Sequence, residues 1–198
     1  KSTYELVQIK RNSSVVWRAV WSSFLPLKIS FLAWQLLHNC LPLDEILQQW
    51  GFHLPSKCQC CDQREAVWHI FLEGSLAHQV WGFIHTGFGV AYGNHPCFSS
   101  ALMQWILSCP NGALNHIHCA VPLVVICYIW WSHNAARFEW VKISSADIIS
   151  QVQYIFHLLG KSFRVKQSQL VGDLDSIFAR CFLKFSKLPG KPRWLLCG

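Results

Sequence analysis

The longest uncharged stretch of this chain runs from Gly74 to Ala136, which is 63 residues without Asp, Glu, Lys or Arg. So long a run must be largely buried, in a protein core, under a partner or in a bilayer. Its most apolar part, Cys119–Trp131, spans 13 residues and contains Pro122, whereas a membrane span needs about 20. We therefore expect a buried helix or an interaction face here, and no membrane attachment.

The net charge of +7 is concentrated at the C-terminal end. Residues 1–160 carry nine Lys/Arg and eight Asp/Glu, whereas residues 161–198 carry eight Lys/Arg and two Asp. A basic tail behind a nearly neutral body predicts attraction to a polyanion such as nucleic acid, although a solvated linker explains the composition equally well. The candidate nucleic-acid-binding residues are Lys161, Arg164, Lys166, Arg180, Lys184 and Lys187.

The ten cysteines do not follow a disulfide pattern, although their number is even. Most lie singly among apolar residues, where a free Cys acts as a small hydrophobe. The chain starts without Met and without an apolar targeting segment. We therefore expect a fragment of a longer protein that is not secreted and lies in a reducing, intracellular compartment, nuclear or cytoplasmic.

One cysteine cluster differs from the rest: Cys58 and Cys61 form a C-x-x-C pair, and His69 follows eight residues later. This spacing lets a tight turn aim two thiolates at one metal ion, and imidazole is a third donor that zinc accepts. A structural zinc site takes four donors in a tetrahedron. On spacing alone, cysteines in a loop beside a capping or core His remain an equal alternative.

Helical periodicity dominates the sequence outside this loop, and no sustained strand pattern is present. We predict an all-α, mainly helical fold: a small irregular helical bundle with a Cys/His zinc-binding loop and a basic C-terminal tail. Pro122 is expected to kink or split its helix. The expected helices cover residues 17–24, 26–40, 43–50, 65–72, 76–84, 99–108, 113–139 and 145–160.

The motif and its surroundings resemble the zinc-binding region of plant non-LTR (LINE-type) retrotransposon reverse transcriptases. The matching residues are Trp17, Trp21, Pro26, Lys28, Phe31, Trp34, Leu41-Pro42, Leu47, Cys58, Cys61, Glu65, His69-Ile70-Phe71, Ala77, Val80 and Trp81, with weaker similarity at Ile129-Trp130-Trp131, Asn134 and Phe138-Glu139. The resemblance implies a zinc-binding accessory region that assists nucleic-acid binding, RNA or DNA, beside an upstream polymerase domain.

The sequence departs from this family where the fourth zinc ligand is expected. That ligand is a Cys five residues after the His, and here the position is Gly74. Glu73 would share a helix face with His69, and carboxylate oxygen binds zinc. Cys60, His78 and a water molecule are the alternatives. The predicted metal ligands are therefore Cys58, Cys61, His69 and Glu73.

Two smaller departures suggest drift in a decayed copy. Leu43 replaces the usual Thr after the leucine-proline pair, which removes a helix cap. His133 stands where an Arg is common. The alternative function is accordingly a metal-free copy that acts as a helical protein–protein interaction module, with the uncharged middle as its partner surface.

We expect three segments and no enzymatic activity. Residues 1–90 form the zinc-binding domain, 91–160 a helical extension and 161–198 a basic tail or linker, with the downstream ribonuclease H-like domain absent. Polymerase and ribonuclease H chemistry needs clustered carboxylates that hold two metal ions. The ten acidic residues are dispersed, and Asp173 and Asp175 have no third acid beside them.

Overall fold

The computed structural model describes residues 15–61, 63–91, 93, 95, 97–108 and 115–162, with side chains up to residue 158. Within this part of the chain the protein is helical and contains no strand, as the sequence predicts. The elements are α2 (Val15–Val20), α3 (Leu27–Leu37), α4 (Asp44–Gln49), the π-helical turn η1 (His69–Glu73), α5 (Ser75–Phe88), α6 (Phe98–Leu107), α7 (Asn115–Phe138) and α8 (Ser145–Ser162).

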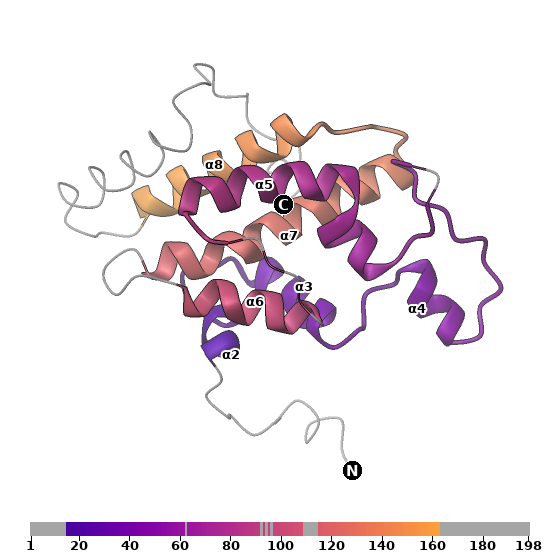
Figure 1. Ribbon diagram of the computed structural model, residues 1–198, viewed down its shortest axis with the longest axis horizontal. Coiled ribbons are helices and arrows are strands. Elements are labelled where there is room, and N and C mark those ends of the chain that lie inside the picture. The colour runs from indigo at the N-terminus through magenta and orange to yellow at the C-terminus, as the bar shows by residue number, and fades with distance from the viewer. Residues whose placement is uncertain are drawn as a thin grey trace, which may run out of the picture.

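Helix α7 is the centre of the bundle (Figure 1). It packs against α2, α3, α5, α6, α8 and η1, and 15 of its 24 residues are buried. A helix that is apolar on every side must be surrounded in this way. By length and composition α7 could cross a membrane, but 72% of its most apolar window is buried inside the protein. The uncharged stretch of the sequence is therefore largely the core of the fold.

Pro122 lies inside α7 without splitting it, so of the two predicted outcomes, a kink or a split, the split does not occur. A proline has no N–H, which leaves the carbonyl four residues earlier, that of His118, without its helical partner. The indole N–H of Trp105 on α6 donates to that carbonyl at 2.8 Å. A side chain from a neighbouring helix thus replaces the missing backbone bond.

One hydrophobic core runs through the whole described bundle. Val20 and Phe71 from the N-terminal half lie in the same cluster as Val124 and Ile148. The C-terminal end of α3 also agrees with the prediction that Asn39 helps to stop this helix. The helix ends at Leu37, and Asn39 takes a left-handed conformation with φ 53°. The predicted division at residue 90 stays a prediction.

The segment between α4 and η1 has little regular structure. The helix predicted for residues 65–72 begins only at Val67 and becomes the π-helical turn η1 at His69. In Figure 1, α4 and the loop after it lie at one end of the bundle. The basic tail, including Arg164, Lys166, Arg180, Lys184 and Lys187, and the side chain of Lys161 lie outside the described residues.

Candidate metal centre

The C-x-x-C pair is shaped by a tight turn of the backbone. The N–H of Cys58 donates to the carbonyl of Gln63 at 2.9 Å, which closes the turn. The N–H of Cys60 donates to the Sγ of Cys58 at 3.4 Å. Such a bond favours the thiolate form that a metal ion requires. Cys58 is buried, Cys61 is half-buried and Cys60 is exposed.

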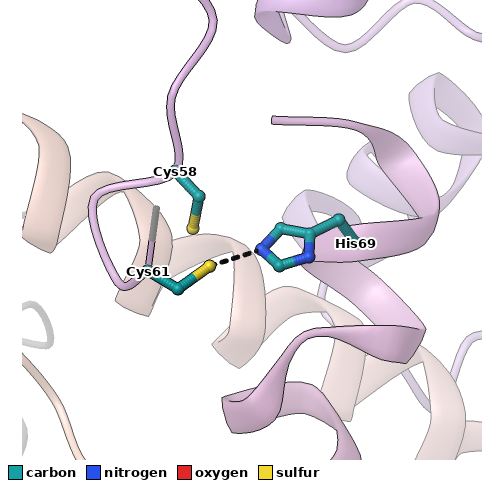
Figure 2. A group of neighbouring side chains, drawn as sticks. All are labelled: Cys58, Cys61 and His69. Carbon is teal, nitrogen blue, oxygen red and sulfur yellow. Dashed lines mark hydrogen bonds between the residues drawn. The ribbon is translucent and has the colours of Figure 1, made fainter. Parts of the chain in front are cut away.

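His69 is the first residue of η1 and faces the two sulfurs (Figure 2). Its Nε2 lies 3.1 Å from the Sγ of Cys61. The donor atoms of Cys58, Cys61 and His69 all lie within 4.8 Å of one another. The structure therefore brings together three of the four predicted ligands, from a loop and a helical turn.

The three donors fit a zinc ion. Zinc–sulfur bonds of about 2.3 Å and zinc–nitrogen bonds of about 2.0 Å place neighbouring donors roughly 3.5–3.8 Å apart in a tetrahedron. The observed limits, 3.1 Å between Cys61 and His69 and at most 4.8 Å overall, bracket this value. Two thiolates and one imidazole are also the soft and borderline donors that zinc prefers.

The pKa values of the cysteines show which thiol proton a metal ion would have to displace. A hydrogen bond with the Cys60 sulfur, together with burial, raises the pKa of Cys58 to about 12. The same bond lowers the pKa of Cys60 to about 7. Without metal, Cys58 is therefore a thiol at neutral pH. Metal binding must release this proton, so metal affinity should rise with pH.

The fourth predicted ligand, Glu73, does not join this group. It is exposed at the end of η1 and lines a different cavity, with Trp68 and Leu72. The turn that carries both His69 and Glu73 is π-helical, with the N–H of Gly74 donating to the carbonyl of His69 at 2.7 Å. Cys60 and His78, the alternatives, also lie outside the group of three.

The residue whose backbone lies beside the imidazole of His69 is Gly74. A Cβ atom added to Gly74 would come within 3.3 Å of the Cε1 of His69 and 2.5 Å of its carbonyl oxygen. The φ of Gly74 is −59°, so its conformation does not itself demand glycine. The absence of a side chain leaves room for the tight backbone bond that closes η1.

A buried ion network fixes the loop at Glu65, which lies between Cys61 and His69 in the chain, and the sequence did not predict it. Glu65 is 0% exposed, and its carboxylate accepts hydrogen bonds from Arg137 Nη1 at 2.9 Å and from the N–H of Asp44 at 3.1 Å. His133 Nε2 lies 2.9 Å from the same carboxylate. Arg137 also bonds Asp44 at 2.7 Å. The network joins the loop to the start of α4 and to α7.

The electrostatics of this network favour its charged form. Burial by itself works to raise the pKa of Glu65, but the hydrogen bond and charge of His133, the N–H of Asp44 and the charge of Arg137 outweigh it and lower that pKa. The hydrogen bond with Asp44 raises the pKa of Arg137. His133 therefore has a defined partner, although its replacement of an arginine suggested drift.

Part of this network had a signal in the sequence. His133 and Arg137 are four residues apart, and this spacing puts them on one face of α7. Arg137 is also the first charged residue after the long uncharged stretch. Their partner Glu65 lies 72 residues before Arg137, and no local pattern links residues at such a distance.

Residues 1–81 match the family model for zinc-binding in reverse transcriptase. The match covers all three donors and supports the assignment of this segment as a reverse-transcriptase zinc-binding region. Such a region is a metal-binding accessory to the polymerase and not its catalytic domain. The rest of α5 and the helices α6, α7 and α8 lie beyond the matched residues. No curated protein and no solved structure matches the chain.

Proposed function

We propose that this chain is the non-catalytic zinc-binding accessory region of a plant LINE-type retroelement reverse transcriptase, and that it helps the polymerase hold nucleic acid. The observation that carries the proposal is the convergence of Cys58, Cys61 and His69 within the segment that matches the family model. Each donor type is one that zinc accepts, and their separations suit one ion.

The zinc ion would act as a cross-link. Cys58 and Cys61 would hold it from the loop and His69 from η1. Because the loop after α4 has little regular structure of its own, such a link would order it against the bundle. Zinc bound in this way supplies folding free energy rather than chemistry.

Exposed apolar side chains, two of them aromatic, support the nucleic-acid role. Phe138, Trp140 and Val141, at the end of α7, are 71%, 82% and 50% exposed. Trp140 also has a φ of 58°, a conformation that a bulky side chain rarely adopts. Strained residues cluster at functional sites, so a strained and exposed aromatic residue suggests a site that contacts a binding partner. Bases stack on such rings without sequence preference, with about 1–3 kcal/mol for each base.

Metal binding is tested by elemental analysis of the purified full chain. We expect one zinc ion per chain, with its loss in Cys58→Ser and His69→Ala. Cys40→Ser, which changes an exposed cysteine outside the donor group, is the matched control and should keep zinc. A protein that holds no zinc after dialysis against buffered zinc overturns this part of the proposal.

Nucleic-acid binding is tested by titration with single-stranded RNA and duplex DNA at two salt concentrations. We expect binding that weakens steeply with salt, because basic residues release counterions from phosphates. Trp140→Gly should weaken single-strand binding by about 1–3 kcal/mol while keeping or raising stability, since glycine adopts φ 58° freely. Trp50→Ala, which removes the exposed tryptophan that directly follows α4, is the control.

The same titration separates the alternative function. A helical interaction module without metal should bind neither nucleic acid, even at low salt. That result, together with the absence of zinc, would replace the accessory-region proposal with the interaction module. Binding that Trp140→Gly leaves unchanged would exclude stacking on this residue and direct attention to the basic tail.

A further inference from the structure

The candidate metal centre has three donors among the described residues, one fewer than a closed tetrahedral site requires. The backbone of position 74 lies against the imidazole of His69, but Gly74 has no side chain to offer. Three protein donors with a fourth position left open is the arrangement of zinc sites that exchange a ligand. The surroundings of the centre decide whether anything can reach that position.

A cavity of about 300 Å³ adjoins the three donors. Cys58, Cys61 and His69 line it on one side, and residues of the α7–α8 connection, Lys142 and Ser144, line it on another. Lys142 and Ser144 are exposed, so solvent reaches the cavity. Its size accommodates a small ligand beside the ion.

The charges around the cavity favour an anion. Two thiolates and one neutral imidazole would leave a zinc centre with no net charge. Lys142 then adds a positive charge, and no Asp or Glu is among the described residues that line the cavity, where Cys60 is the one further thiol. His133 also lines it, is 4% exposed, and its Nδ1 has no hydrogen-bond partner. In this cavity a small anion would have both an open coordination position on the ion and the positive charge of Lys142 beside it.

We propose that the metal centre keeps one coordination position open to this cavity and binds there a small monodentate anion, or water in its absence, next to Lys142. The inference rests on the proposed zinc binding. It differs from a purely structural zinc site in one respect: the bound ion would remain accessible to exchangeable ligands.

The test uses the full chain with Co²⁺ in place of zinc, and thiocyanate as the probe anion. Thiolate-to-cobalt charge-transfer absorption reports that Cys58 and Cys61 hold the ion. The visible d–d bands of cobalt depend on its coordination, so they should shift saturably as thiocyanate is added. A charge-transfer band with d–d bands that never change overturns the inference alone. The absence of cobalt binding overturns the proposed metal site as well.

Three variants sharpen this experiment. Lys142→Gln should weaken thiocyanate binding about two- to fivefold at low salt, and less at high salt, because an exposed charge is screened. Gly74→Cys adds a fourth thiolate and should abolish the response, whereas Gly74→Ala adds the same Cβ without a donor and should keep it. The turn must shift to admit this Cβ, so circular dichroism checks that both variants fold.

Cys60→Ser tests the remaining sulfur donor of the loop. If the fourth position is open, this variant should respond to thiocyanate as the unmodified protein does. If Cys60 fills the position, the unmodified protein should be silent and Cys60→Ser should respond, which overturns the inference. This pair of outcomes does not depend on whether Gly74→Cys folds.

Discussion

Two attachments of different kinds hold the loop between α4 and η1 to the bundle. At the Glu65 attachment, the buried carboxylate is bonded to Arg137, Asp44 and His133, so every partner is supplied by the protein. At the cysteine attachment, Cys58, Cys61 and His69 converge but need an ion to bind them together. The first attachment is complete in the chain alone, and the second is conditional on metal. Removing metal should therefore loosen the cysteine attachment and leave the Glu65 attachment in place.

The largest effect is expected from breaking the ion network. Arg137→Ala leaves Asp44, which is 2% exposed, without its cation, and leaves Glu65, which is 0% exposed, with only His133. An unpaired buried charge destabilises a fold by about 3–5 kcal/mol. Urea unfolding followed by circular dichroism measures the change. Arg18→Ala, on the exposed side of α2, should stay within about 0.5 kcal/mol. A loss under 1 kcal/mol in Arg137→Ala would show that the network contributes little.

Zinc should have the next largest effect, and only at the cysteine attachment. At a free zinc concentration about 100 times its dissociation constant, the free energy of unfolding should rise by about 2.7 kcal/mol. A chelator should remove this gain without reducing helix content, because the bundle core does not involve the ion. Far-ultraviolet circular dichroism with urea unfolding measures both. A chelated protein that loses most of its helix would mean that the core depends on the metal.

Acid should weaken the Glu65 attachment selectively. The pKa of Glu65 in the folded protein is lowered from its ordinary value, which is about 4.3 in an unfolded chain. Its contribution is therefore complete above that pH and is lost as the pH falls through the folded pKa. Between pH 5 and pH 3, roughly, the unfolding free energy should fall more steeply than in Glu65→Gln. Both proteins are measured in chelator, because acid also releases zinc. Parallel curves would contradict the prediction.

Ser56→Ala should give the smallest effect, of about 1 kcal/mol. The hydroxyl of Ser56 accepts from the N–H of Glu65 at 3.0 Å and donates to its carbonyl at 3.3 Å. A typical intramolecular hydrogen bond has a net contribution of this size. The comparison is made by urea unfolding with and without zinc. A loss that doubles in zinc would mean that the two attachments of the loop act together.

The sequence predicts well what depends on local pattern. The helices appear because apolar residues recur at helical spacing, and the central position of α7 follows from its lack of charge. Cys58, Cys61 and His69 are recognisable because metal ligands occur at characteristic spacings. Glu73 does not lie with them: it is exposed at the end of η1 and lines a different cavity, and a spacing of four residues does not show which cavity a side chain enters.

What the sequence could not predict depends on contacts between distant residues. The partnership of Glu65 with Arg137 requires that the loop fold back onto α7, and no periodicity carries that information. The same is true of the bond between Trp105 and the carbonyl of His118. Leu43 illustrates both cases: it provides no side-chain cap for α4, as expected, but Glu65 bonds the N–H of Asp44 in its place.

The bond from Trp105 also has a consequence for the order in which the protein assembles. Because Pro122 removes a backbone donor, α7 cannot satisfy all its carbonyl groups by itself, and the indole of α6 completes them only after the two helices dock. The hydrogen bonding of α7 is thus completed by a side chain of α6. Pro122 therefore couples the folding of α7 to that of α6. A fragment that begins after Leu107 lacks Trp105, so the carbonyl of His118 would have no protein donor from α6.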